Sequence, residues 1–137
     1  MFAGQRTGED LAAHYASADL FLFPSLTETF GNVTLEAMAS GLAVIAYDYA
    51  AARELVTHRE NGLVAPFDAA ETFCALAGEI VAESKTRRAL GLAARHTAES
   101  TSWSTIYSLF EQALFDVVKM SERNSYAATH ELSSRTT

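Results

Sequence analysis

The sequence predicts an α/β protein built on a parallel sheet with flanking helices. Two observations support this fold class: apolar runs short enough to be strands, and helical patterns between them. The runs at 20–23 and 43–47 are apolar throughout, which is typical of strands covered by helices on both faces. Strands that alternate with helices of about ten residues indicate βαβ crossovers and therefore parallel pairing. We expect a partial Rossmann-like parallel sheet of about four strands.

The four apolar runs lie at 1–3, 20–23, 43–47 and 62–65. Before the second run, Thr7 precedes Glu9, Asp10 and an apolar series at helical spacing, so a helix with Thr7 as its N-cap is predicted. After the fourth run, Asp68 and Glu71 have the spacing of a capping box, which indicates another helix start.

A last long helix is predicted to begin near Ser102. Its apolar residues recur at three- and four-residue steps and form one stripe for packing on the sheet: Trp103, Ile106, Tyr107, Phe110, Leu114 and Val117. From about Ser121 polar residues dominate, so we expect one domain over 1–120 and a disordered tail over 121–137. Because the chain opens directly on a strand and the sheet is thin, we interpret it as the second half of a larger Rossmann-like domain.

Composition excludes several classes of function. The formal net charge is −7 and the ten Lys and Arg residues are scattered, whereas nucleic-acid binding needs clustered cations. No apolar run approaches the ~20 residues of a transmembrane helix, and no signal peptide is recognisable. Cys74 is the single cysteine, so a cytoplasmic location is expected, with peripheral association at the inner face of the membrane left open. Its helical apolar surroundings favour a place in the core.

Residues 24–41 are the candidates for chemistry. They run from the carboxyl end of a buried strand into a helix, and open parallel sheets bind ligands in the crevice at such strand ends. Gly31 lets the backbone approach a ligand, and Asn32 is a suitable N-cap. Three amides would then point outward at the positive end of the helix dipole, which suits a phosphate: those of Val33, Thr34 and Leu35.

Two glutamates frame this turn, and Gly41 fits the position that ends the helix. Glu36 is expected in the first helical turn, where the dipole favours negative charge. A carboxylate repels phosphate but accepts hydrogen bonds from a vicinal diol, as the acidic residue of Rossmann enzymes does with ribose. Glu28 is free to face a sugar hydroxyl or a basic group. Spacing alone leaves a second interpretation open, in which Glu36 only complements the dipole and Glu28 is a solvated loop residue.

The surrounding residues resemble the Glu-x7-Glu signature of family 4 glycosyltransferases. The match consists of Glu28 followed by Phe30 and Gly31, and of Glu36 followed by Ala-Met-Ala-Ser-Gly at 37–41. It extends to further segments at 15–19, 23–25, 43–46, 53–56 and 61–64, so the resemblance covers about residues 1 to 118. A match this dense is specific to the family but not to a donor.

The resemblance implies the two-domain GT-B architecture, with this chain as the second half of its C-terminal, donor-binding domain. An N-terminal domain would hold the acceptor, a sugar or a lipid. The implied reaction transfers a hexose from a nucleotide-diphosphate sugar with retention of configuration. GDP-mannose is the leading donor and a UDP-sugar is the alternative. No cofactor is implied, and the sequence has no Asp-x-Asp metal motif, so metal-independent transfer is expected.

The same resemblance assigns roles to individual residues. Glu28 is the candidate catalytic residue and would contact the donor hexose, whereas Glu36 would hold the ribose diol. The remaining donor-binding candidates are the backbone of Phe30, Gly31 and Asn32 at the sugar hydroxyls, the amides of Val33 and Thr34 at the diphosphate, and Arg6 beside the base.

The sequence departs from the family pattern in two places. Members usually supply an Arg and a Lys that neutralise the leaving diphosphate, and those positions fall before Met1. Ala50 and Ala51 stand where many members have Gly-Gly. A non-catalytic nucleotide or nucleotide-sugar binding module is therefore the alternative function.

A flavodoxin-like signalling domain is a third hypothesis, but Asp48 lacks the acidic pair and the lysine of a phosphorylation pocket. Asp48 itself suits a turn as well as the cleft. Arg53 and Glu54 suit local pairs on a helix surface.

Overall fold

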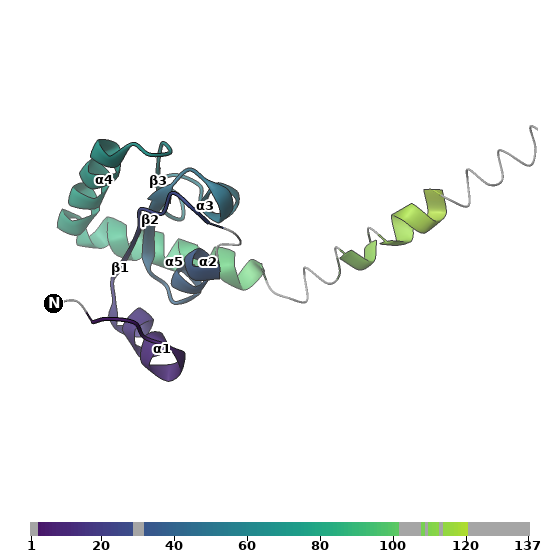
Figure 1. Ribbon diagram of the computed structural model, residues 1–137, viewed down its shortest axis with the longest axis horizontal. Coiled ribbons are helices and arrows are strands. Elements are labelled where there is room, and N and C mark those ends of the chain that lie inside the picture. The colour runs from purple at the N-terminus through teal and green to yellow at the C-terminus, as the bar shows by residue number, and fades with distance from the viewer. Residues whose placement is uncertain (1–2, 29–31, 102–107, 109, 113, 121–137) are drawn as a thin grey trace, which may run out of the picture. The chain divides into compact units, whose positions relative to one another are not determined.

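The computed structural model describes residues 3–28, 32–101, 108, 110–112 and 114–120. The chain divides into two compact units, Met1–Ser100 and Thr101–Thr137. The first unit contains, in chain order, α1 (Gly8–Ser17), β1 (Leu20–Phe23), α2 (Asn32–Ala39), β2 (Ala43–Tyr47), α3 (Ala50–Leu55), β3 (Leu63–Ala65), α4 (Ala70–Ala82) and α5 (Ser84–Ser100) (Figure 1).

The strands form one parallel sheet in the order β1-β2-β3. Leu20 pairs with Ala43 at the start of β1, and Ile45 pairs with Leu63 at the start of β3. The predicted strands at 20–23 and 43–47 are confirmed to the residue, and β3 starts one residue after the predicted Gly62. Of the predicted strand at 1–3, Met1 and Phe2 lie outside the described residues and Ala3 is not in a strand. The described sheet therefore has three strands, and the α/β fold class is confirmed.

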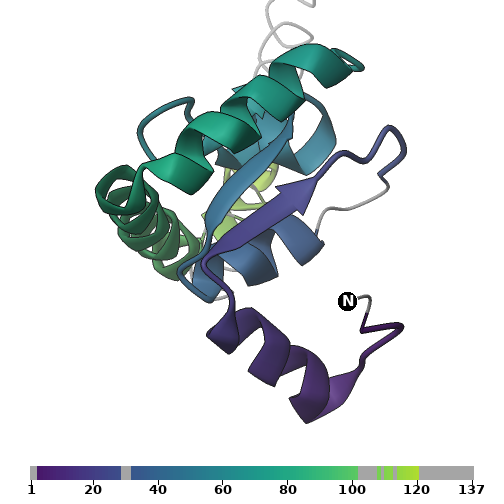
Figure 2. The ribbon, with the colours of Figure 1, turned by 90° about the vertical axis from the view of Figure 1, so that its left-hand side faces the viewer.

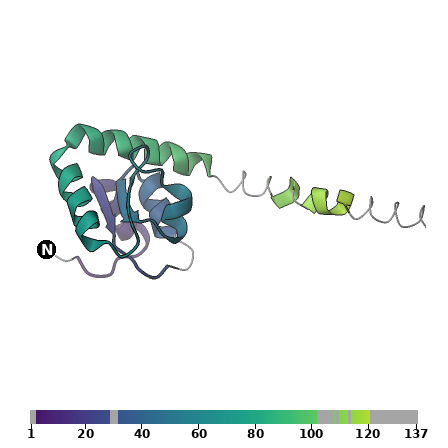
Figure 3. The ribbon, with the colours of Figure 1, turned by 90° about the horizontal axis from the view of Figure 1, so that it is seen from above.

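Strand β2 forms the centre of two hydrophobic cores because all five of its residues are buried. Val44 and Ala46 face a core shared with α2, α3 and the second half of α5. The alternate residues of β2 face a second core with β3, α4 and Leu90 of α5. Figure 3 shows the strands between α4 on one side and α2 and α3 on the other, with α5 running across from one layer to the other. Helices therefore pack on both faces of β2.

Strand β1 is less covered than its apolar sequence predicts. Leu22 is 47% exposed, and Phe21 and Phe23 are only half-buried. The reason is the placement of the helices, since α4 packs on β2 and β3 and α2 packs on β2, which leaves β1 with less cover. The prediction of cover on both faces is therefore correct for β2 and wrong for β1.

Helix α1 begins after the predicted N-cap, Thr7, although the Thr7 side chain makes no capping hydrogen bond. None of the helix residues is fully buried. Figure 2 shows α1 on the side of the sheet from which β1 starts, set apart from the other helices. Tyr15 is the α1 residue that packs against the first core, and its ring centroid lies 5.9 Å from that of Phe21.

Two local predictions around α4 are wrong. The N-cap is Ala69 rather than Asp68, which has a φ of 61°, so the capping box does not form. Aspartate tolerates this left-handed turn conformation, and its carbonyl accepts a hydrogen bond from Ala70 N–H at 3.0 Å. Cys74 is exposed because the neighbouring Phe73 is the residue that faces the sheet.

The second unit is described at Thr101, 108, 110–112 and 114–120, and all of these residues except Thr101 are helical. The helix prediction is confirmed at Phe110, Leu114 and Val117. The predicted start near Ser102, the apolar positions up to Tyr107 and the tail at 121–137 lie outside the described residues. Within the described part of the chain, no helix combines the length and the apolarity that crossing a membrane requires.

Candidate functional site

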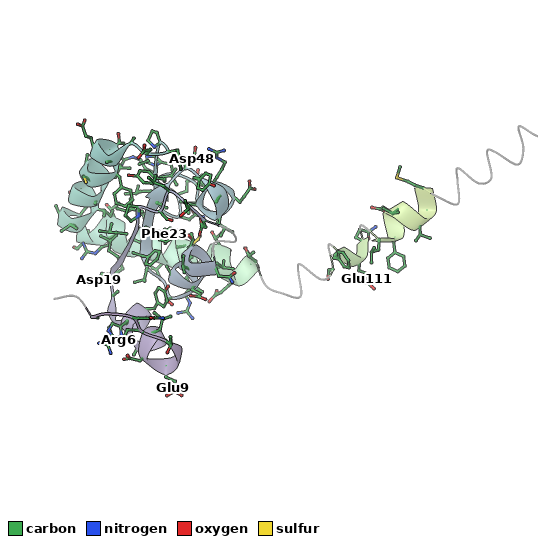
Figure 4. The ribbon with its side chains drawn as sticks, in the orientation of Figure 1. Arg6, Glu9, Asp19, Phe23, Asp48 and Glu111 are labelled. Atoms are coloured by element: carbon green, nitrogen blue, oxygen red, sulfur yellow. The ribbon has the colours of Figure 1, made fainter. Side chains whose placement is uncertain are left out.

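The carboxyl ends of the three strands lie at one edge of the sheet because all the strands are parallel. The chain leaves this edge after Phe23, Tyr47 and Ala65. Figure 4 shows Phe23 and Asp48, at the ends of β1 and β2, and Asp19 at the opposite end of β1. The segment after β1 contains Glu28 and leads into α2, so the predicted ligand-binding stretch occupies the edge that parallel sheets use for ligands.

Helix α2 begins at Asn32. Asn32 is therefore inside the helix and not the residue before it, so the prediction of Asn32 as the N-cap is wrong. Helix boundaries read from sequence shift by a residue or so because a cap differs from the first turn only in its backbone angles. Phe30 and Gly31 lie outside the described residues. The N–H groups of Asn32, Val33 and Thr34 belong to the first turn, where no partner exists within the helix. They give this end of α2 its partial positive charge.

The end of α2 is fixed by the glycine that the sequence predicts there. Gly41 has a φ of 76°, and its N–H donates to the Met38 carbonyl at 2.9 Å. Leu42 N–H donates to the Ala37 carbonyl at 3.1 Å. This pair of hydrogen bonds is a Schellman motif, and the predicted helix end is confirmed. Because Ala37 and Met38 are fully buried, the opposite face of α2, which carries Glu36, points away from the core.

Glu36 lies in the second turn of α2, not in the first turn as predicted. Helix dipole effects fade beyond the first turn, so complementing the dipole explains Glu36 poorly. Glu36 is exposed and lines a cavity of about 380 Å³ between α1 and α2. The other lining residues are Gly8, Leu11, Ala12, Tyr15, Ala39 and Ser40.

Tyr15 faces Glu36 across this cavity. Burial raises the pKa of the Tyr15 hydroxyl, and the charge of Glu36 and a hydrogen bond to its carboxylate raise this pKa further. Sequence reasoning missed this relationship: it placed Tyr15 in the apolar series of a helix and in the segment 15–19 that resembles the family, with no role at the site. No local signal could reveal it, since the two residues lie on different helices.

Glu28 is half-buried, and its Oε1 atom is inaccessible to solvent. None of the described residues donates a hydrogen bond to this oxygen. The hydroxyl of Thr34, in the first turn of α2, is likewise buried without a hydrogen-bond partner in the described part of the chain. Buried polar atoms without partners are rare because each costs about 1–3 kcal/mol. Within the described residues, Glu28 Oε1 at the sheet edge therefore lacks a hydrogen-bond donor, whereas the Thr34 hydroxyl is enclosed in the core.

Two arginines, Arg6 just before α1 and Arg53 in α3 after the end of β2, are each paired with an aspartate. Arg6 donates to Asp10 Oδ2 at 3.0 Å, and Figure 4 shows Arg6 beside α1. Arg53 donates to Asp48 Oδ1 at 3.1 Å and to the Asp48 carbonyl at 2.7 Å. Arg53 thus forms a local pair as the sequence predicts, and Asp48 takes the role of a turn residue.

An aromatic cluster that sequence reasoning did not identify follows β2 and β3. The ring of Phe67 lies 4.9 Å from Tyr49 and 6.3 Å from Tyr47. Tyr47 in turn contacts Phe73 of α4 at 5.3 Å. These contacts fix the loop after β3 to the end of β2.

In the part of the chain that the structure describes, no group of three or more His, Cys, Asp or Glu side chains is arranged to hold a metal ion.

A family model described as glycosyl transferases group 1 matches residues 1–83. The chain is 40% identical over 106 residues to a GDP-mannose-dependent alpha-mannosyltransferase of Mycolicibacterium smegmatis. This alignment covers 77% of the chain but only 28% of the mannosyltransferase. The chain thus spans little more than a quarter of that relative.

Solved structures also superpose on this chain. Sucrose-phosphate synthase from Thermosynechococcus elongatus superposes with a TM-score of 0.74 at 30% identity, over 88% of this chain and 30% of the synthase. Anabaena HepE in complex with UDP and glucose superposes with a TM-score of 0.72 at 25% identity, over 85% of this chain and 32% of HepE. The predicted GT-B affiliation of the fold is confirmed.

Proposed function

The chain belongs to the glycosyl transferases group 1 family, and we propose that it is the donor-binding part of a hexosyltransferase. The donor is a nucleotide-diphosphate sugar, and transfer retains the configuration of the sugar without a metal ion. The single observation that carries the proposal is the buried, unpartnered Oε1 of Glu28 at the carboxyl edge of the sheet. An acceptor atom of this kind is completed by a ligand hydroxyl, and a hexose supplies several.

The first turn of α2 supports a place for the diphosphate. Its N–H groups, which have no partner within the helix, and the positive end of the helix dipole attract anions. From Asn32 to Glu36 the helix rises about 6 Å. A nucleotide that rests its diphosphate on the amides of Asn32, Val33 and Thr34 therefore brings its ribose near Glu36. The exposed Glu36 carboxylate then accepts hydrogen bonds from the two ribose hydroxyls.

The relatives support the class of donor. The name of the M. smegmatis protein specifies GDP-mannose, and the HepE structure contains UDP and glucose. Both nucleotides carry a diphosphate, which the first turn of α2 can bind, and a ribose, which Glu36 can bind. We propose GDP-mannose as the leading donor and a UDP-sugar as the alternative.

The acceptor, a sugar or a lipid, binds in our proposal to a further domain, because the chain spans only 28% of its mannosyltransferase relative. That domain faces the carboxyl edge of the sheet. It also brings the acceptor hydroxyl to the anomeric carbon, where Glu28 contacts the donor hexose.

A binding module without catalysis is the second candidate, and one observation favours it for the isolated chain. Arg6 and Arg53 are paired with Asp10 and Asp48, so neither is free to neutralise the charge that develops on a leaving diphosphate. Stabilisation of such charge is usually the largest electrostatic contribution to catalysis. The isolated chain then binds the donor, and turnover needs cations from elsewhere in the enzyme.

Calorimetric titration of the chain with GDP, UDP, GDP-mannose and UDP-glucose tests the proposal. We expect saturable binding of at least one nucleotide together with its sugar form, and a weaker interaction with the matching nucleoside monophosphate. Glu71→Ala is a matched control, since Glu71 is exposed on α4 and that helix covers the opposite face of the sheet. Absence of binding to all four ligands by a folded chain would refute the proposal.

A further inference from the structure

Tyr15 is the residue of α1 that packs against the first hydrophobic core. Its ring is half-buried against the first core and contacts Phe21, whose own ring stacks on Phe23 at 5.7 Å. No residue of α1 is fully buried, so this aromatic contact sets the position of the Tyr15 hydroxyl. An aromatic ring has only two side-chain dihedral angles, so ordering it costs little conformational entropy.

Glu36 is placed differently. It is exposed on the outer face of α2, and a freely rotating glutamate side chain loses conformational entropy when a ligand orders it. Tyr15 and Glu36 line the same 380 Å³ cavity, from α1 and α2 respectively. An ionised carboxylate offers about four acceptor sites, so a hydrogen bond from Tyr15 leaves capacity for two ligand hydroxyls.

We propose that Tyr15 is a positioning residue, whose hydroxyl holds the Glu36 carboxylate in the orientation that receives the two hydroxyls of the nucleotide ribose. This inference rests on the proposed function, in which Glu36 binds the ribose. It adds that helix α1 takes part in donor recognition through Glu36 and without touching the reacting atoms. The raised pKa of Tyr15 agrees with this arrangement, because after burial its causes are the charge of Glu36 and a hydrogen bond to that carboxylate.

The test compares the chain with Tyr15→Phe, Glu36→Ala and the double variant, each titrated with GDP and with 2′,3′-dideoxy-GDP. Tyr15→Phe keeps the ring and its contact with Phe21, and its thermal midpoint shows that the fold is retained. We expect Tyr15→Phe to weaken GDP binding about three- to tenfold, the range that one hydrogen bond represents. It should leave dideoxy-GDP binding unchanged and cause no further loss in the Glu36→Ala background.

Two results would overturn the positioning role. One is an equal loss of GDP and dideoxy-GDP binding in Tyr15→Phe, because the effect would then not pass through the diol. The other is an additive loss in the double variant, because Tyr15 would then act independently of Glu36.

A second measurement separates failure of this inference from failure of the proposed function. In ¹³C-tyrosine spectra, Glu36→Gln should lower the pKa of Tyr15, because it removes the charge that favours the neutral hydroxyl. An unchanged Tyr15 pKa would overturn the inference whatever the nucleotide data show. A shifted pKa in a chain whose GDP affinity does not depend on Glu36 would instead refute the ribose role of Glu36.

Discussion

Gly91 of α5 packs directly on the backbone of Gly41, the residue that ends α2. A Cβ atom at position 91 would overlap the Gly41 carbonyl oxygen and approach the Ala43 nitrogen at 3.5 Å. Helix α5 therefore braces the connection between α2 and β2 through contact of two backbones. This contact supports α2, and with it the position of Glu36 above the cavity.

We predict that Gly91→Ala lowers the free energy of unfolding by about 1–3 kcal/mol, the usual cost of overpacking. The thermal midpoint should fall by several degrees, since about 1 kcal/mol corresponds to roughly 4–8 °C in a domain of this size. Gly78→Ala is the matched control, because a Cβ at this exposed position of α4 meets nothing within 4 Å. The control should gain up to about 1 kcal/mol. Equal midpoints for the two variants would contradict the close packing.

Asn61 is the second structural test, because its buried side chain joins three segments. Its Oδ1 accepts from Thr57 N–H at 2.7 Å, and its Nδ2 donates to the Leu55 carbonyl and to Thr97 Oγ1, both at 3.0 Å. Asn61→Ala should lower the free energy of unfolding by about 2–3 kcal/mol, measured by urea denaturation. Thr97→Val removes one of these bonds and should cost less. A larger loss in Thr97→Val than in Asn61→Ala would show that Asn61 is not the centre of this network.

Sequence reasoning recovered the features that depend on local patterns. The strands at 20–23 and 43–47 and the glycine end of α2 at Gly41 follow from apolar runs and backbone geometry, which a short segment determines. The predicted roles of Glu28 and Glu36 are untested, and they remain predictions together with those of Arg6 and the α2 amides.

Features that depend on distant contacts were missed. The exposure of Leu22 results from helix packing on β2 and β3 rather than on β1, and the Tyr15–Glu36 relationship joins two helices separated by a strand. The misplaced caps at Asn32 and Asp68 have a different cause. The same residue types, Asn and Asp among them, serve as helix caps and as turn residues. The two roles differ only in backbone angles, which the sequence does not display.

The ion pair between Arg59 and Glu79 predicts a pH dependence of stability. A hydrogen bond from Arg59 is the main cause that lowers the pKa of Glu79 below its ordinary value of 4.5. A lowered folded-state pKa contributes stability above 4.5, and this contribution disappears as the pH falls through the lower folded-state value. The stability difference between the chain and Glu79→Gln should therefore shrink below pH 4.5. The pair is exposed, so the difference should be small and should decrease with added salt. A constant difference from pH 3 to 7 would contradict the pairing.

Transfer by the chain alone is the next prediction. One helix N-terminus supplies roughly half a unit of positive charge, and Arg6 and Arg53 are paired with aspartates. We expect no transfer of mannose from GDP-mannose to a sugar or lipid acceptor by the purified chain. Activity should appear in a longer protein that adds the acceptor domain and basic residues for the diphosphate. Robust transfer by the 137 residues alone would show that this chain supplies the missing cations itself.

The central claim, that Glu36 binds the ribose and Glu28 binds the hexose, is tested most directly by titrating Glu36→Ala and Glu28→Ala with GDP and with GDP-mannose. If UDP is the nucleotide that the chain binds, the same comparison uses UDP and UDP-glucose. Glu36→Ala should lower the affinity for both ligands about tenfold or more. Each ligand contains the ribose, and a hydrogen bond to a charged group is worth about 1.5–3 kcal/mol. Glu28→Ala should lower the affinity for the sugar nucleotide and leave the affinity for the free nucleotide unchanged. Equal losses of free nucleotide affinity in the two variants would contradict the assignment.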